Sequence, residues 1–146
     1  MVQVADTSLT SYLTAAWGEE VDRFAELTER QFTAAKRLAA QQAFRSCVRQ
    51  EMKDVEAALW IEGVEGSNET ARKASLQDKA AHNPQYQELQ RQERNVDQAI
   101  AGEEAELQRT SNLISLSRRQ LDWTIMVGRM AAADADPPSR AQRGGH

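Results

Sequence analysis

The sequence has few of the residues that build a thick globular core. Leucine, isoleucine, valine and phenylalanine together account for 26 of the 146 residues, and 23 of the 59 apolar residues are alanine. So few large apolar side chains cannot line a cleft of the kind that encloses a small-molecule substrate. The net charge of −4 is too small to expand the chain, as it does in strongly charged disordered proteins. These deficits predict a long, solvent-rich helical structure with a narrow apolar seam.

Other absences exclude further classes of protein. The single cysteine, Cys47, rules out an internal disulfide and is typical of a reducing compartment. No apolar run approaches the roughly 20 residues that cross a membrane. The segment from Met1 to Asp6 lacks the basic and apolar regions of a secretory signal. We therefore expect a cytoplasmic protein of one domain with no membrane contact.

Proline and glycine are also rare, so the few that occur divide the chain clearly. From Ser8 to Glu62 there is no proline and only Gly18 interrupts the segment. Ser8 is a suitable N-cap, and Gly63 is suitable as a left-handed C-terminal cap. Apolar residues recur at steps of three and four, which indicates one face of an α-helix over about 8–62. They are Leu9, Leu13, Trp17, Val21, Phe24, Leu27, Phe32, Ala35, Leu38, Phe44, Val48, Met52, Val55 and Leu59.

Two further helices are expected after a glycine-containing turn. Ser67 or Asn68 can cap a short helix over about 69–82. Asn83-Pro84 ends that helix and provides the N-cap and first position of a third helix over about 84–133. We expect the remaining residues, 134–146, to form a disordered tail.

The third helix carries a seam with the three-and-four spacing of a heptad repeat. Four of its twelve positions are polar, so the seam is incomplete. Its expected members are Tyr86, Leu89, Glu93, Val96, Ile100, Glu104, Leu107, Ser111, Ile114, Arg118, Leu121 and Ile125.

The distribution of charge indicates how the two long helices pair. Residues 1–30 and 54–107 are acidic, with net charges of −4 and −7, whereas residues 31–53 and 108–146 are basic, with net charges of +4 and +3. An antiparallel hairpin sets acidic blocks against basic blocks, and partner residue numbers then add up to about 140 to 145. Arg45, for example, would lie near Asp97. Because charge patterns select orientation and register, the sequence predicts an all-α antiparallel helical hairpin with a short connector helix.

Catalytic and metal-binding patterns are scarce. Asp78 and His82 are one helical turn apart, but two ligands are too few for a metal site, and His146 ends the expected tail. Cys47 lies beside Val48, where we expect a small buried apolar side chain. The segment from Gly63 to Gly66 matches a loop that clamps RNA backbones, but its Glu65 would repel phosphate, so a turn explains it. We expect no enzymatic activity, no metal and no cofactor.

A basic stretch offers a candidate phosphate-binding site. Arg45, Arg49 and Lys53 are spaced four residues apart and form a stripe on one helix face. The competing interpretation is that these residues face the acidic block of the opposite helix. Both interpretations stay open at the level of sequence.

Aromatic residues offer a candidate protein-binding surface. The hairpin places Trp17 and Trp123 at the same open end, where we expect them to touch, and Trp60 beside the turn. These side chains either close the ends of a thin bundle or form an exposed cluster that anchors a partner, since tryptophan and tyrosine dominate interface hot spots. The candidate partner-binding residues are Tyr12, Trp17, Trp60, Trp123 and Met126.

The connector also carries a resemblance. The segment from Glu65 to Ala74, followed by Asn83 to Leu89 and a polar coiled coil, resembles small helical proteins encoded by bacteriophages. Its layout is similar to that of phage recombination mediators, which load a recombinase onto single-stranded DNA. The resemblance implies a non-enzymatic helper that oligomerises and contacts DNA or DNA enzymes, although this chain departs from it in being acidic.

From these observations we expect a non-enzymatic helical interaction protein, encoded by a phage, that binds another protein such as a nucleic-acid enzyme of host or phage. Self-association could complete its incomplete seam. One alternative is an oligomeric recombination mediator that binds single-stranded DNA through Arg45, Arg49 and Lys53. A second alternative is a structural spacer in a larger assembly.

Overall fold

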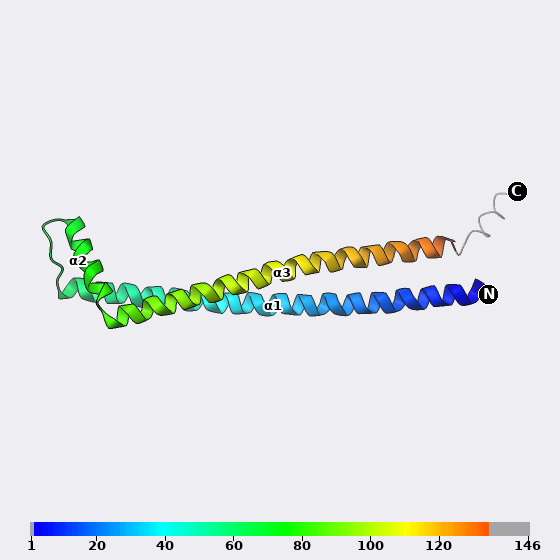
Figure 1. Ribbon diagram of the computed structural model, residues 1–146, viewed down its shortest axis with the longest axis horizontal. Coiled ribbons are helices and arrows are strands. Elements are labelled where there is room, and N and C mark those ends of the chain that lie inside the picture. The colour runs from blue at the N-terminus through cyan, green and yellow to red at the C-terminus, as the bar shows by residue number, and fades with distance from the viewer. Residues whose placement is uncertain (1, 135–146) are drawn as a thin grey trace. The chain divides into compact units, whose positions relative to one another are not determined.

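The described part of the chain contains three helices. The computed structural model describes residues 2–134, with side chains from Ser11 onward. The helices are α1 (Val2–Glu62), α2 (Glu69–Ala81) and α3 (Pro84–Asp134), and the described residues contain no strand. α1 and α3 pack extensively against each other, and α2 connects them (Figure 1). The predicted all-α helical hairpin with a short connector helix is confirmed.

The helix ends differ slightly from the expected ones. α1 begins at Val2, so Ser8 lies inside the helix and is not its N-cap. Asp134 is the last residue of α3. The rest of the expected disordered tail, including His146, lies outside the described residues.

Packing divides the chain into two units. The connector unit, Thr33–Leu107, contains the second part of α1, all of α2 and the first part of α3. The terminal unit contains residues 1–32 and 108–146, of which 2–32 and 108–134 are described, and is built from the first part of α1 and the second part of α3.

Contacts between α1 and α3 define the direction and register of the pairing in each unit. In five side-chain contacts the two residue numbers add up to 140 or 142, which requires antiparallel helices and lies within the expected register. The predicted approach of Arg45 and Asp97 is confirmed by an ion pair of 3.4 Å. The contacts are Glu20 with Gln120 and Phe24 with Arg118 in the terminal unit, and Arg45 with Asp97, Arg49 with Glu93 and Glu56 with Tyr86 in the connector unit.

From Glu20 onward, the buried face of α1 follows a strict heptad repeat. Its fully buried members include Leu27, Val48 and Leu59, and polar residues such as Gln31 and Gln41 occupy positions between them. Several apolar residues that we assigned to this face are instead exposed. They are Trp17, Val21, Phe32, Ala35 and Phe44. Packing against an antiparallel neighbour keeps the buried positions at a seven-residue repeat. The spacing of the apolar residues in the sequence departs from this repeat.

The buried face of α3 is also a strict heptad repeat. Beyond Ile100 the expected seam was right at Leu107, Ile114 and Leu121 and wrong at the positions between them. The expected seam advances by four residues to Ile100 and by another four residues to Glu104. The structure keeps alternating steps, so half-buried Glu103 follows Ile100 and Glu104 is exposed. Thr110 and Ser117 are consequently buried in place of Ser111 and Arg118, and Ile125 is exposed.

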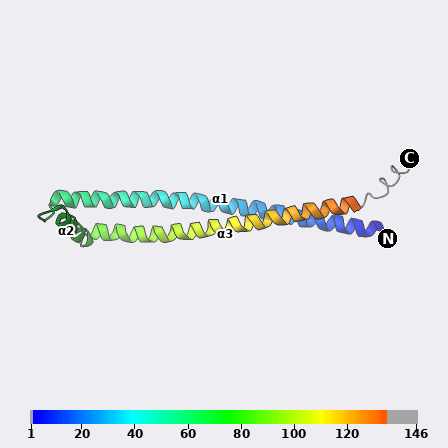
Figure 2. The same ribbon diagram turned by 90° about the horizontal axis from the view of Figure 1, so that it is seen from above.

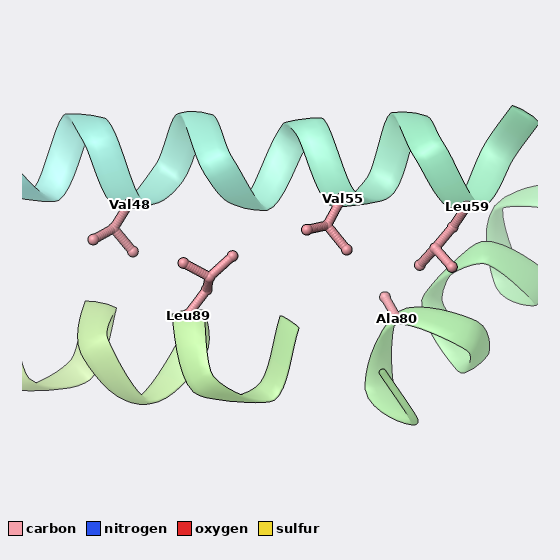
Figure 3. Packing of buried hydrophobic residues seen from close by; sticks show 5 residues of the cluster. All are labelled: Val48, Val55, Leu59, Ala80 and Leu89. Atoms are coloured by element: carbon pink, nitrogen blue, oxygen red, sulfur yellow. The ribbon is translucent and has the colours of Figure 1, made fainter. Parts of the chain in front are cut away.

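The largest apolar cluster lies in the connector unit. Val48, Val55 and Leu59 of α1 face Leu89 of α3 and Ala80 of α2 (Figure 3). α2 lies across the ends of the two long helices in both views (Figures 1 and 2), so it closes this cluster where the hairpin turns. Met52, Leu76 and Tyr86 pack against the cluster from its sides.

Side-chain caps set the ends of the connector helix and the start of α3. The Asn68 side chain accepts a hydrogen bond from the Ala71 amide at 2.8 Å, and the Asn83 side chain accepts one from the Tyr86 amide at 3.0 Å. Pro84 then occupies the first position of α3, where a missing N–H costs nothing. The predicted caps are thus confirmed, with Asn68 and not Ser67 starting α2.

The turn between α1 and α2 needs two glycines. Gly63 and Gly66 both have positive φ angles, of 118° and 150°. A Cβ on Gly66 would also lie 2.7 Å from the Cβ of Ala71, too close for any real contact. α2 ties the turn down, because Lys79 donates to the Gly63 carbonyl and Arg72 donates to the Gly66 carbonyl at 3.3 Å.

Replacing Leu59 by alanine tests the connector cluster. Leu59 is buried, so Leu59→Ala should lower the free energy of unfolding by about 2–3 kcal/mol through lost burial and a cavity. Ile61, two residues along the same helix, is 85% exposed, so Ile61→Ala should change it by less than about 0.5 kcal/mol. Urea unfolding followed by circular dichroism measures both; equal losses would contradict the assignment of the buried face.

Two glycine-to-alanine changes should shift the free energy of unfolding in opposite directions. Gly66→Ala should destabilise the protein by about 1–3 kcal/mol, because the new methyl group meets Ala71 and the φ angle is strained. Gly102→Ala should stabilise it by about 0.5–1 kcal/mol, because Gly102 lies within α3 with open space around it. Thermal unfolding of the two variants beside the parent chain checks both; a neutral Gly66→Ala would contradict the turn geometry.

Candidate protein-interaction surface

The interior of the terminal unit is filled partly by small polar side chains. Thr110 and Ser117 of α3 are 0% and 1% exposed, and they stand where larger apolar residues would pack a helical seam. The Ser117 hydroxyl is buried without a hydrogen-bond partner among the described residues, a state that costs about 1–3 kcal/mol. Among the side chains of this unit that the structure describes, Leu27 and Ile114 are the buried apolar ones. The seam between α1 and α3 is therefore weak here.

Large apolar side chains of the terminal unit lie mostly outside its seam. Among the described side chains, the terminal unit exposes ten large apolar residues, whereas the connector unit exposes three, Phe44, Trp60 and Ile61. A concentration of this kind on a pair of helices is typical of an interaction surface. The ten are Tyr12, Trp17, Val21, Phe32, Leu113, Leu116, Trp123, Ile125, Met126 and Met130.

Part of this exposed set forms a second row along α3. Beginning at Leu113, the row advances by alternating steps of three and four residues, as the buried seam does, but on a neighbouring face of the helix. We call this row the outer stripe; its members are Leu113, Leu116, Gln120, Trp123, Val127 and Met130. Trp123 is 63% exposed, and Val127 is half-buried. α3 thus carries two heptad rows, and α1 covers one of them.

A groove runs beside the outer stripe. It has a volume of about 380 Å³, and Leu27 and Ser117 of the buried seam line it. On its α3 side lie Leu113, Leu116 and Gln120 of the outer stripe, and on its α1 side lie Arg23, Glu26 and Arg30. One wall is therefore largely apolar and the other is charged.

Two contacts fix the level of α1 against α3 in this unit. The Arg118 guanidinium lies over the Phe24 ring, 5.7 Å from its centroid, a distance suited to a cation–π contact. The Gln120 amide, with its nitrogen toward α1, donates to both carboxylate oxygens of Glu20 at 3.0 and 3.1 Å. Glu20 also lies 3.8 Å from Arg23 one turn along α1.

The candidate partner-binding residues are distributed over both units. Tyr12, Trp17, Trp123 and Met126 belong to the terminal unit and Trp60 to the connector unit, and all five are exposed. Tyr12 is the most exposed of them, at 71%. The contact between Trp17 and Trp123 stays a prediction.

The basic stretch meets acidic residues of α3. Arg45 pairs with Asp97, and the Arg49 Nε donates to the Glu93 carboxylate at 3.1 Å. Lys53 is exposed, and no ion pair to it is present within residues 11–134. Two of the three candidate phosphate ligands are thus already engaged with carboxylates across the hairpin.

Other candidates for chemistry lie in simple surroundings. Cys47 is exposed, not buried as we expected, because the heptad repeat places Val48 in the seam and turns the preceding residue outward. His82 is exposed at the end of α2, where its Nδ1 lies 2.7 Å from the Asp78 carbonyl oxygen. The described residues contain no cluster of three or more metal-ligating side chains.

Tyr86 has a strongly raised pKa. Burial and a 2.8 Å hydrogen bond from its hydroxyl to the Glu56 carboxylate raise its pKa to about 12. The phenol therefore stays protonated at neutral pH and serves as a donor that joins α3 to α1.

Comparison with known proteins assigns no role to this surface, so it is interpreted from its own geometry. No family model, curated protein or solved structure matches this chain. The residues that carry the resemblance to phage proteins, including Gly66, Asn68 and Asn83, prove to be turn and cap residues. None of the helices in the described residues is long and apolar enough to cross a membrane.

Sequence reasoning found Trp123 but not the outer stripe to which it belongs. The signal was present, since Leu113, Leu116 and Met130 share the spacing of Trp123. It was missed because a single seam was fitted to α3, and the fitted seam took polar residues beyond Ile100. Two interleaved heptad rows on one helix are the pattern that would have revealed the surface.

Reversing an ion pair tests the register of the hairpin. Arg49→Glu sets two carboxylates against each other and should lower the free energy of unfolding by about 1 kcal/mol or less, since the pair is partly exposed. Glu93→Arg should cost a similar amount, and the double variant should recover most of the loss. Urea unfolding of all four proteins at low salt gives the coupling; additive losses without recovery would contradict the pairing.

Proposed function

We propose that this chain is a non-enzymatic helical interaction protein that binds another protein through the terminal unit. The observation that carries the proposal is the exposure of Trp123, Tyr12 and their apolar neighbours on a unit whose own seam is filled with small polar side chains. Large aromatic residues contribute most of the affinity in protein interfaces. An exposed apolar row at helical spacing is suited to a helical partner.

The resemblance of the connector to phage-encoded helical proteins supports a phage origin, with a nucleic-acid enzyme of host or phage as the partner. Sequence and structure contribute different parts of this proposal. The connector residues suggest the class of protein, and the surface of the terminal unit suggests how it acts.

The alternative function is a recombination mediator that binds single-stranded DNA. Its phosphate ligands would be Arg45, Arg49 and Lys53. The ion pairs of Arg45 and Arg49 weigh against it, because phosphate would have to replace Asp97 and Glu93. A structural spacer remains the second alternative, and it would have no specific partner.

Replacing the aromatic residues separates partner binding from a spacer role. The tagged chain is used to capture proteins from extracts of the cells that produce it, and captured proteins are quantified by mass spectrometry. Trp123→Ala should lose a specific partner at least roughly tenfold, as expected for a hot-spot residue. Phe44→Ala, an equally simple change at an exposed aromatic residue of the connector unit, should retain it.

Circular dichroism must show that both variants keep the parent helix content. A partner retained by Trp123→Ala would contradict the proposal. DNA binding is measured separately by the anisotropy of a labelled oligo(dT) at increasing salt. A steep negative slope that disappears in Lys53→Ala would favour the mediator, whereas no binding at low salt removes it.

A further inference from the structure

We propose that a second copy of this chain covers the groove of the terminal unit, lying antiparallel to the first across a two-fold axis. The inference rests on the proposed function only in treating the outer stripe as an interface. It adds that a second copy of the chain, distinct from the partner of the proposed function, binds along the outer stripe, and it gives the orientation in which that copy binds.

The charged wall of the groove has an order that suits an antiparallel copy of itself. Along α1, residues 19, 23, 26 and 30 form a single row at steps of four, three and four. Arg23, Glu26 and Arg30 line the groove, and Glu19 lies one turn before them. The signs along the row are therefore negative, positive, negative, positive, and reversing the row exchanges every negative position with a positive one.

A two-fold axis through the middle of this row pairs opposite charges throughout. Glu19 then faces Arg30 of the second copy, and Arg23 faces Glu26 of the second copy. Symmetry repeats both contacts, as in any interface in which residue i meets j and j meets i. The centre of the row lies between Phe24 and Ala25.

The outer stripe on α3 is compatible with this axis. An antiparallel self-pairing centred on Arg118 sets Leu113 against Trp123 of the second copy, and Leu116 against Gln120 of the second copy. A self-pairing centred between residues 121 and 122 brings more apolar residues together, but it moves the axis along the unit to a level where no charge of the α1 row meets an opposite charge. Arg118 stacks over Phe24, so the pairing centred on Arg118 lies at the same level as the centre of the charged row. The charged row therefore selects this pairing of the outer stripe.

Other arrangements of two copies fail on charge or on burial. A parallel, in-register pairing sets each charge of the α1 row against its own copy, so every contact is repulsive. Setting α1 of one copy over α3 of the other places Arg23 and Glu26 against Leu113 and Leu116, which removes charges from water without partners. In the antiparallel arrangement the apolar row supplies affinity, and the exposed ion pairs select the orientation.

Charge reversal on the α1 row tests the pairing in the full-length chain. Glu19→Arg with Glu26→Arg makes the row wholly basic, and Arg23→Glu with Arg30→Glu makes it wholly acidic. The mass of each protein is measured by sedimentation equilibrium over a range of concentrations. The parent chain should be a dimer, and each double variant should dimerise at least roughly tenfold more weakly, because four contacts become repulsive.

An equimolar mixture of the basic and acidic variants should recover a dimer that contains one of each. Recovery in the mixture cannot come from a change in the stability of a single helix, because each chain keeps its own substitutions. Glu69→Arg, an exposed charge reversal on α2, serves as the matched control and should leave the dimer unchanged.

Cross-linking tests the orientation. In a Cys47→Ser background, one chain carries Glu19→Cys and the other carries Arg30→Cys, and a short bismaleimide is added. The mixture should cross-link, whereas each chain alone should not, since identical positions lie far from each other across the axis. A Glu19→Cys chain that cross-links efficiently to itself would overturn the antiparallel arrangement.

The remaining outcomes also decide the inference. A parent chain that is a monomer at all concentrations overturns it, as does a dimer that both charge variants retain. Neither result touches the proposed function, which stands or falls with the partner lost in Trp123→Ala. Conversely, a dimer with these properties and no such partner contradicts the proposed function and leaves this inference in place.

Discussion

The structure depends on how one long helix divides its apolar residues between two faces. An antiparallel neighbour holds α3 to a seven-residue repeat, so the positions that meet α1 are set by geometry and not by where large side chains occur. In the connector unit the positions that face the other helix hold large apolar residues, and Val48, Val55 and Leu59 meet Leu89. In the terminal unit these positions and the large apolar residues do not coincide, because the repeat buries Thr110 and Ser117 and leaves Trp123 outside.

This difference separates a packed apolar cluster from an exposed apolar surface along the chain. The connector unit has an apolar cluster, a connector helix that closes it, and caps at Asn68 and Asn83 that fix its turns. It leaves three large apolar side chains exposed, those of Phe44, Trp60 and Ile61. The terminal unit keeps most of its large apolar side chains in contact with water, so its free energy falls when another surface covers them.

The sequence predicted the features that local chemistry determines. Helix class, the caps at Asn68 and Asn83, the left-handed Gly63 and the antiparallel register follow from spacing and charge, and the structure bears them out. Which residues of each long helix form the buried face could not be predicted in the same way. Apolar residues at positions such as Val21 and Phe32 compete with polar residues at neighbouring positions, and only the packing partner decides which face is buried. Cys47 and the outer stripe were misjudged or missed for this same reason.

Hydrogen exchange resolved along α3 tests the account most directly, because amide protection reports how firmly each turn is packed. At low protein concentration, amides near Val96 should exchange slowly and amides near Ser117 quickly. Raising the concentration should slow exchange near Ser117 and leave Val96 unchanged, since the proposed second copy covers the terminal unit and not the connector unit. Equal and concentration-independent protection at the two places would contradict the account, because the terminal unit would then be stable without a partner.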